Sequence, residues 1–168
     1  KNIGVDGIKT GHLVVEEYSL ASSIKKDKRR LIAVGSGFKT NSSRISQSRK
    51  LLTWGLTNTE TFEISKKEET IFEIQTWLGK EKITKGYTKK NIYQTIDKKD
   101  LRGFDVFLEY TGPLIAPIKK DQEIALIKIY NKKNLIESVP VYAVKKVKKV
   151  NFFISLLTSF NYMIWGDA

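Results

Sequence analysis

The residues whose types could act together chemically stand near the beginning of the sequence, in the triplet Lys9-Thr10-Gly11. The triplet combines an amine, a hydroxyl and a glycine at which another backbone can approach closely. His12 follows directly and is the only histidine. Because a histidine without a partner is weak evidence for proton transfer, we expect His12 in a cleft wall or on the surface. A three-residue string also fits an ordinary strand edge and turn, so its surroundings must decide what it does.

Composition excludes several kinds of site. The 168 residues are 40% apolar, enough to bury a core in one ordinary domain or two small ones. The absence of cysteine excludes disulfides and thiol nucleophiles, and we expect no metal and no cofactor. A formal charge of +12 makes polyanions, anionic lipid or acidic polymers plausible neighbours. Without a zinc-finger spacing, an aromatic RNA-binding strand pair or a basic recognition helix, we expect a solvated lysine-rich surface and no nucleic-acid partner.

The ends of the sequence carry two further signals. The first residue is Lys1 and the only methionine is Met163, so we expect a fragment or a processed product. Residues 1–11 alternate polar and apolar types, and they lack the charged start and apolar run of a signal peptide.

Residues 1–61 must position the triplet, and their pattern predicts strands and a helix. The expected elements are two strands and one helix, at Tyr18–Ser23, Arg30–Ser36 and Asn41–Thr57. Ser42 or Ser43 can cap the helix, and we expect Gly55 to loosen or end it.

Residues 62–146 change to a period of two, which predicts a small all-β domain without a helix. Its clearest strands are Phe62–Ile64, Ile71–Trp77, Phe104–Tyr110 and Ile124–Tyr130.

Residues 147–168 form an amphipathic pattern that follows a lysine-rich stretch. The apolar positions of the predicted helix are Phe152, Phe153, Leu156, Leu157, Phe160, Met163, Ile164 and Trp165. The segment is shorter than the roughly 20 apolar residues that span a bilayer, so we expect it to lie in the membrane interface as an anchor. The alternative is a terminal helix packed on the protein's own core.

Several segments, taken in order, carry a family resemblance. They are GVDGIKTGH (residues 4–12), EYSLASS (17–23), RRLIAVGSG (29–37), SRISQSRKLLTWG (43–55), LIAPIKKDQ (114–122) and VNFF (150–153). The series resembles D-alanyl-D-alanine carboxypeptidases of the low-molecular-mass penicillin-binding class, over essentially the whole chain. The resemblance implies an α+β fold: the C-terminal part of a β-lactamase/DD-peptidase-like sheet-and-helix domain, a small all-β domain and a C-terminal amphipathic helix. It also implies an apolar face on residues 1–61 where the rest of the catalytic domain packs.

The resemblance implies a reaction in which an active-site serine of an S-x-x-K motif is acylated by the terminal D-Ala-D-Ala of a peptidoglycan stem peptide. D-Alanine is released, and water then frees the enzyme. Both S-x-x-K and S-x-N precede the Lys-Thr-Gly triplet in that family, so we expect this fragment alone to be inactive. We interpret the matching strings at residues 22–25, 36–39 and 159–161 as chance matches. The implied partners are stem peptides, β-lactam antibiotics and the inner-membrane surface, at its periplasmic face.

The roles of individual residues follow from the resemblance. Lys9 is implied to add positive potential near the serine and to help hold the anionic substrate. Thr10 offers a hydroxyl to the substrate carboxylate, and Gly11 permits close backbone approach. Arg44 is implied to face the terminal carboxylate, which suits its guanidinium fork, and His12 is expected in the wall of the substrate cleft.

Two alternatives stay open. The first is a non-catalytic, membrane-associated module whose working part is the all-β domain. The second is a β-lactamase-like hydrolase, against which the all-β domain and the terminal helix argue. Residues 13–17, which follow His12, depart from the common family pattern, and the match resumes at Tyr18, so substrate preference and turnover are not determined.

Overall fold

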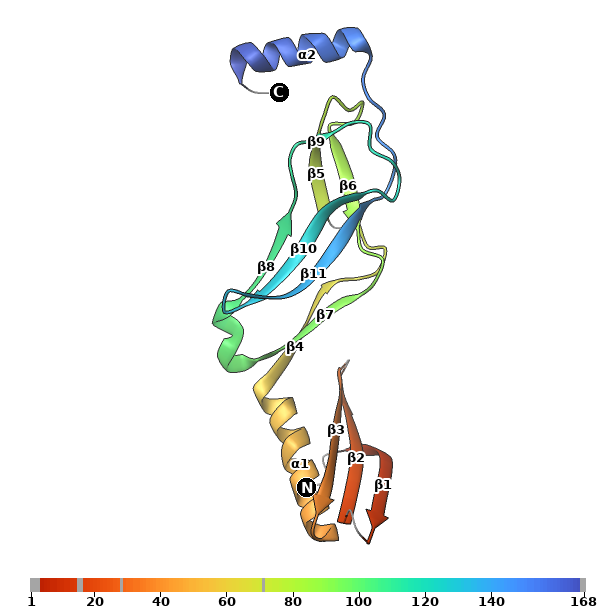
Figure 1. Cartoon of the computed structure of the whole chain (residues 1–168), viewed down its shortest axis with the longest axis vertical. Coiled ribbons are helices and arrows are strands. Elements are labelled where there is room, and N and C mark those ends of the chain that lie inside the picture. Colours follow the sequence, from red (N-terminus) through yellow and green to blue (C-terminus); the bar gives the residue numbers. More distant parts are fainter. Residues whose placement is uncertain (1–3, 15–16, 28, 71, 167–168) are drawn as a thin grey trace. The chain divides into compact units, whose positions relative to one another are not determined.

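The computed structural model describes residues 4–14, 17–27, 29–70 and 72–166. Contacts divide the chain into two compact units. Unit 1 comprises Lys1–Phe62 and Thr95–Leu101, and unit 2 comprises Glu63–Gln94 and Arg102–Ala168. The predicted α+β composition is confirmed, with mostly strands and a helix near the C-terminus (Figure 1). The predicted domain boundaries at residues 61/62 and 146/147 stay predictions.

Unit 1 is built on an antiparallel sheet with strand order β1-β2-β3. Its elements are β1 (Val5–Leu13), β2 (Glu17–Lys26), β3 (Arg29–Phe38) and helix α1 (Asn41–Asn58). Leu52 of α1 packs against Ile24 of β2 and Ala33 of β3, and all three side chains are buried. Both predicted strands and the predicted helix are confirmed, and the Lys-Thr-Gly triplet lies in β1.

The N-cap of helix α1 lies two residues before Ser42, the earlier of the two predicted caps. Thr40 is the N-cap, since its Oγ1 accepts a hydrogen bond from the Ser43 backbone N–H at 3.0 Å. The Ser43 hydroxyl oxygen in turn accepts from the Thr40 N–H at 3.3 Å. The prediction of a cap at Ser42 or Ser43 was therefore wrong, because Ser43 is the third helical residue of a reciprocal capping box.

The far end of α1 is held by Arg29, which lies at the start of β3. Its guanidinium donates hydrogen bonds to the carbonyl oxygens of Thr59 at 2.7 Å and Gly55 at 3.2 Å. Gly55 does not end the helix, contrary to expectation. An added Cβ there would lie 3.1 Å from Leu31 Cδ1, so the glycine allows α1 to approach β3 closely.

A two-stranded ribbon pairs β4 (Thr59–Ser65) with β7 (Ile92–Asp97). The hydroxyls of Thr61 and Thr95 are 2.9 Å apart across it. The sequence pattern indicated the first of these strands but not the second, because β7 mixes polar residues with few apolar ones.

Unit 2 contains a six-stranded sheet with the order β8-β10-β11-β6-β5-β9. Its strands are β5 (Phe72–Trp77), β6 (Ile83–Tyr87), β8 (Phe104–Glu109), β9 (Leu114–Ile115), β10 (Glu123–Asn131) and β11 (Asn134–Ala143). A 3-10 helix, η1 (Lys98–Gly103), precedes β8. The predicted strands at β5, β8 and β10 are confirmed; residue 71, the first of the predicted Ile71–Trp77, lies outside the described residues. Strand β11 was missed because Pro140 lies inside it.

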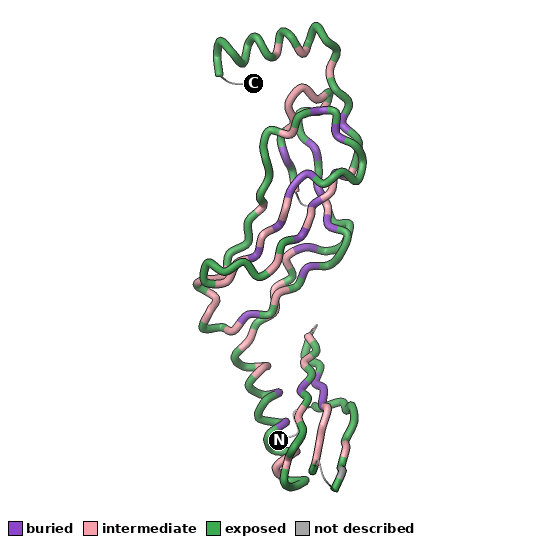
Figure 2. Tube along the Cα trace, viewed as in Figure 1, coloured by how far each residue is buried: buried purple, intermediate pink, exposed green. Residues whose placement is uncertain are grey.

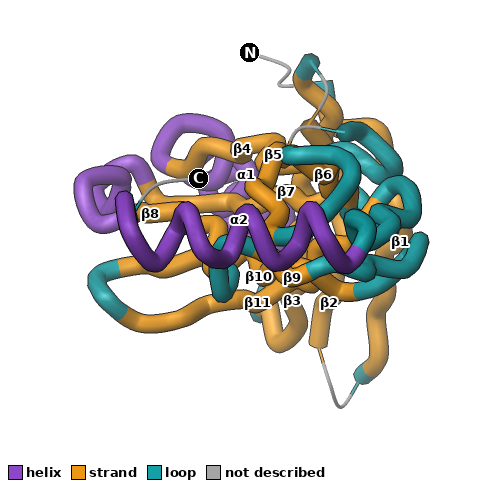
Figure 3. Tube along the Cα trace, turned by 90° about the horizontal axis from the view of Figure 1, so that it is seen from above, coloured by secondary structure: helices purple, strands orange, loops and turns teal. Residues whose placement is uncertain are grey.

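The core of unit 2 lies along these strands, as the buried stretches in Figure 2 show. Its fully buried members include Ile127, Ile129 and Val141. Helix α2 (Phe152–Trp165) follows as a continuous helix that crosses one end of unit 2 (Figures 1 and 3). Within the described residues, no helix has the length and apolar character needed to cross a membrane.

Candidate functional site

The Lys-Thr-Gly triplet lies on β1, an edge strand of its sheet. Lys9 is paired with Ala21 of β2, and Gly11 is paired with Ser19. The opposite edge of β1 has no strand partner within the described residues, so its backbone groups can pair with an extended peptide. A Cβ added at Gly11 would lie 2.4 Å from Ser19 Oγ, so a side chain there would displace the serine hydroxyl.

Successive side chains of a strand point to opposite faces of its sheet, so Lys9 and Thr10 diverge. Both side chains are exposed and make no hydrogen bond or ion pair within the described residues. Both also line two hollows: one of about 550 Å³ between β1, β2 and α1, and one of about 400 Å³ that also involves Val34 of β3. Lys9 and Thr10 therefore both border space that a ligand could occupy.

Arg44 reaches from the first turn of α1 to the triplet. Its Nη1 donates to the carbonyl oxygens of Gly11 at 3.3 Å and Ser19 at 3.5 Å. Its Nη2 donates to Asn41 Oδ1 at 2.6 Å. The Nε–H is buried without a hydrogen-bond partner among the described residues, so one donor of the guanidinium stays unused. The structure thus brings Arg44 and Gly11 together.

An aromatic ring lies against this guanidinium. The Arg44 guanidinium carbon lies 5.3 Å from the centroid of the Tyr18 ring, a cation–π distance. The ring of His12 contacts the same tyrosine edge-on, with centroids 4.2 Å apart. His12 is exposed, and its only described ring contact is with Tyr18. The sequence analysis did not identify Tyr18 and Asn41 as contacts of Arg44. A hairpin after His12 pairs that residue with Tyr18 on β2, and this pairing could have indicated Tyr18.

The start of β1 is fastened to β3 by an ion pair. Arg30 Nη1 lies 2.9 Å and 2.8 Å from the two carboxylate oxygens of Asp6, and it also donates to the Ser23 hydroxyl. The hydrogen bond from Arg30 lowers the pKa of the Asp6 carboxyl below its ordinary value, and the Ser23 hydroxyl adds to this effect.

Two strings that mimic S-x-x-K lie in unsuitable places. Ser22 is buried in β2, and its hydroxyl donates to the Ala33 carbonyl oxygen at 3.4 Å. Lys25, three residues later on the same strand, points to the opposite face. Ser36 lies near the end of β3, and Lys39 lies just beyond it.

The predicted anchor residues all lie on α2, and none is buried. More than half of each side chain is exposed for Phe152, Phe153, Leu156, Leu157, Phe160, Met163, Ile164 and Trp165. The less exposed residues of the helix are Ser155 and Thr158. Tyr162 contacts Trp77 of β5 edge-on, with ring centroids 4.9 Å apart. The structure therefore does not support the alternative of a helix packed on the protein's own core, because no residue of α2 is buried.

Similarity to known proteins decides the family. Residues 60–149, more than half of the chain, match the sequence pattern of the family described as penicillin-binding protein 5, C-terminal domain. The chain belongs to this penicillin-binding protein 5 family. The predicted resemblance is thereby confirmed.

Curated relatives of the penicillin-binding protein 5 family extend the similarity beyond residues 60–149. D-alanyl-D-alanine carboxypeptidase DacD of Salmonella typhimurium is 32% identical over 164 residues, which cover 96% of this chain and 42% of the relative. D-alanyl-D-alanine carboxypeptidase DacC of Escherichia coli is 33% identical over 154 residues, which cover 90% of this chain and 38% of the relative. The chain therefore spans about two fifths of the length of these relatives.

A solved structure shows the same fold. Penicillin-binding protein 5 of Haemophilus influenzae superposes with a TM-score of 0.73 and 30% identity, over 88% of this chain and 43% of that one. The similarity includes much of unit 1 as well as unit 2, because it covers more of the chain than residues 60–149. The roles of Lys9, Thr10, Gly11, His12 and Arg44 stay predictions.

Proposed function

We propose that the complete protein is a serine-type D-Ala-D-Ala carboxypeptidase of peptidoglycan stem peptides. A serine contributed by a part of the protein outside this sequence attacks the carbonyl carbon of the penultimate D-alanine. The peptide bond breaks, D-alanine leaves with a proton on its amine, and an ester to the serine remains. Water then hydrolyses this ester. Penicillin acylates the same serine, and the present chain alone is inactive.

The observation that supports this proposal most directly is the contact of Arg44 with Gly11, the last residue of the triplet. A stem peptide extended along the open edge of β1 would pair with backbone groups of the triplet. Its terminal carboxylate would then lie near the guanidinium, which suits a carboxylate better than an ammonium does. Lys9 supplies positive potential beside the serine, and the Thr10 hydroxyl meets the carboxylate at the strand edge.

We also propose that α2 attaches the protein to the periplasmic face of the inner membrane. Its exposed phenylalanine, leucine and tryptophan side chains support this proposal, because such side chains are costly in water and stable at the acyl-chain boundary. The polar Ser155 and Thr158 lie on the less exposed side of the helix. The helix therefore offers its apolar surface outward.

Labelling with fluorescent penicillin tests the enzymatic proposal. The complete protein should be labelled covalently, Lys9→Ala should be labelled much more slowly, and Lys25→Ala on β2 should behave as wild type. The 168-residue chain should not be labelled. If the complete, folded protein takes up no penicillin, the proposal is wrong. The non-catalytic membrane-associated module, favoured by the self-contained core of unit 2, would then take its place.

Flotation with lipid vesicles tests the attachment. Leu157→Glu places a charge among the exposed apolar side chains and should abolish flotation. Ser159→Glu adds the same charge at an exposed polar position of the helix and should lower flotation much less. Equal behaviour of the two variants would contradict attachment through the apolar surface.

A further inference from the structure

The turn between β5 and β6 is joined directly to the segment that leads into α2. The Lys80 backbone N–H donates to the Lys148 carbonyl oxygen at 2.8 Å, and the Val150 N–H donates to the Leu78 carbonyl oxygen at 2.9 Å. Gly79 and Lys149 also form an isolated β-bridge. These bonds hold residues that are far apart in the sequence side by side at one end of unit 2.

The junction gathers lysine side chains, and we name four of them the basic collar: Lys80, Lys82, Lys148 and Lys149. All four are exposed, and none forms an ion pair within the described part of the chain. Other lysines of unit 2 are paired with acids, such as Lys85 with Glu73 at 3.3 Å and Lys128 with Glu109 at 2.6 Å. The positive charge of the basic collar is therefore not compensated.

Glu81 is the acid inside this turn, and it does not neutralise the basic collar. Its Oε2 atom is buried and lacks a hydrogen-bond partner among the described residues. This oxygen is thus shielded from solvent, while Lys80 and Lys82 on either side of Glu81 are exposed.

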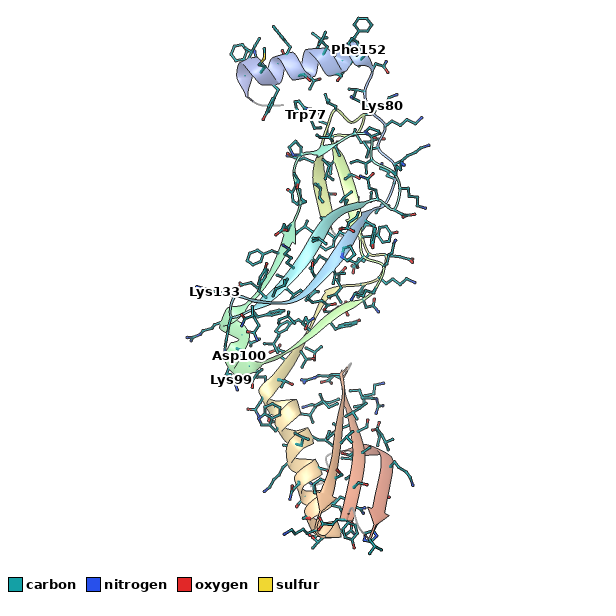
Figure 4. All side chains as sticks on the ribbon, in the orientation of Figure 1. Trp77, Lys80, Lys99, Asp100, Lys133 and Phe152 are labelled. Atoms are coloured by element: carbon teal, nitrogen blue, oxygen red, sulfur yellow. The ribbon has the colours of Figure 1, made fainter. Side chains whose placement is uncertain are left out.

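The basic collar lies beside the exposed apolar side chains of α2. Trp77, Lys80 and Phe152 lie at the same end of unit 2, and Lys133 lies at the opposite end (Figure 4). Trp77 ends β5 and contacts Tyr162 of α2. Tryptophan and tyrosine are enriched where a membrane meets water, and lysine is attracted to anionic headgroups at the same depth.

We propose that the basic collar is a second membrane contact, made by the β unit itself with the headgroups of anionic phospholipids. The proposal rests on the membrane attachment proposed for α2. A bilayer is favoured over a soluble polyanion because uncompensated lysines and exposed apolar side chains adjoin at one end of the unit. The two contacts together hold unit 2 with this end against the membrane, so the β unit does not swing freely on α2.

Vesicle binding by the full chain tests this contact without altering α2. Neutral vesicles of phosphatidylcholine are compared with vesicles that also contain phosphatidylglycerol. The test variant is Lys80→Gln with Lys82→Gln, and the matched control is Lys25→Gln with Lys26→Gln, which removes the same charge from β2. Thermal unfolding is measured for both variants, and a midpoint equal to that of the wild type establishes that each variant is folded.

The wild type should bind the anionic vesicles more tightly, and the test variant should lose about fivefold in that affinity for each lysine, on the order of 25-fold in total. Binding to neutral vesicles should change little, and high salt should remove the difference. An equal loss in the control, or no loss in the test variant, overturns the contact and leaves the attachment by α2 in place. Absence of binding to both vesicles by the wild type overturns both proposals.

Discussion

Arg44 on helix α1 donates a hydrogen bond to the carbonyl oxygen of Gly11 on β1, with Nη1 and the oxygen 3.3 Å apart. The helix thus places a fork-shaped cation at the strand that carries the Lys-Thr-Gly triplet. The two residues are separated by a hairpin, a third strand and the cap of α1, and each of these must form for the contact to exist.

Substitution of Arg44 should lower turnover of the complete protein. Arg44→Ala removes a charge-assisted hydrogen bond to the substrate carboxylate. Such a bond contributes about 1.5–3 kcal/mol, so kcat/KM for release of D-alanine should fall by roughly 10- to 150-fold. Arg44→Lys should recover only part of this loss, because an ammonium lacks the planar fork. Lys50 is exposed on the same helix, and Lys50→Ala is the control variant, which should keep wild-type kcat/KM. Unchanged kcat/KM in Arg44→Ala would remove Arg44 from the substrate site.

Arg29 should stabilise the end of α1. Arg29→Ala removes hydrogen bonds to the carbonyl oxygens of Thr59 and Gly55, where a cation also complements the helix dipole. We expect the local free energy of opening to fall by about 1.5–3 kcal/mol. Amide hydrogen exchange in the last turn of α1, measured on the full chain, checks this value. Lys39→Ala should leave the exchange unchanged, and wild-type exchange in Arg29→Ala would contradict the capping role.

Ile129 should be a major contributor to the stability of unit 2. Its side chain is 0% exposed in the core between β10 and its neighbours. Ile129→Ala should lower the free energy of unfolding by about 2–5 kcal/mol, and Ile129→Val by about 0.5–1.5 kcal/mol. Denaturant unfolding of the full chain gives both values. Ile136 on β11 is partly exposed to solvent, so Ile136→Ala should lower the free energy of unfolding much less. An equal decrease in the two alanine variants would contradict the burial of Ile129 in the core.

Tyr87 should ionise at a higher pH than an ordinary tyrosine. Its hydroxyl donates to Asp121 Oδ1 at 2.7 Å, and this hydrogen bond to the carboxylate raises the pKa of the phenol. The raised pKa adds stability that is complete below the ordinary pKa and is lost as the pH rises through the folded value. Tyrosinate absorbance, taken as the difference between wild type and Tyr87→Phe, measures the midpoint.

The matched variant for this titration is Asp121→Asn. The midpoint of Tyr87 should fall toward the ordinary value, because the negative acceptor is gone. Glu63→Gln, which removes the negative charge from the acceptor of Tyr93, should leave the midpoint of Tyr87 unchanged. A midpoint that does not move in Asp121→Asn would show that the hydrogen bond is not its cause.

The sequence by itself determined the features that depend on neighbouring residues. Local periodicity, which needs no distant partner, indicated the strands at Tyr18–Ser23 and Arg30–Ser36, the helix that begins near Asn41 and the amphipathic pattern of residues 152–165. The strand that carries Lys9 was implied by the family resemblance. The family followed from the order of short segments along the chain. Of the missed elements, β7 has a weak local pattern and β11 contains Pro140, so pairing with neighbouring strands decides both.

Only the tertiary structure decided the relationships between distant residues. Arg44 could be proposed from resemblance, but its contact with Gly11 and the Tyr18 ring depends on how α1 packs against the sheet. An amphipathic pattern is compatible with packing on a core and with binding to a membrane. Only the structure shows that the apolar side chains of α2 are exposed. The basic collar likewise exists because backbone hydrogen bonds bring Lys80 beside Lys148. Such contacts depend on chain folding over long separations, which local composition does not encode.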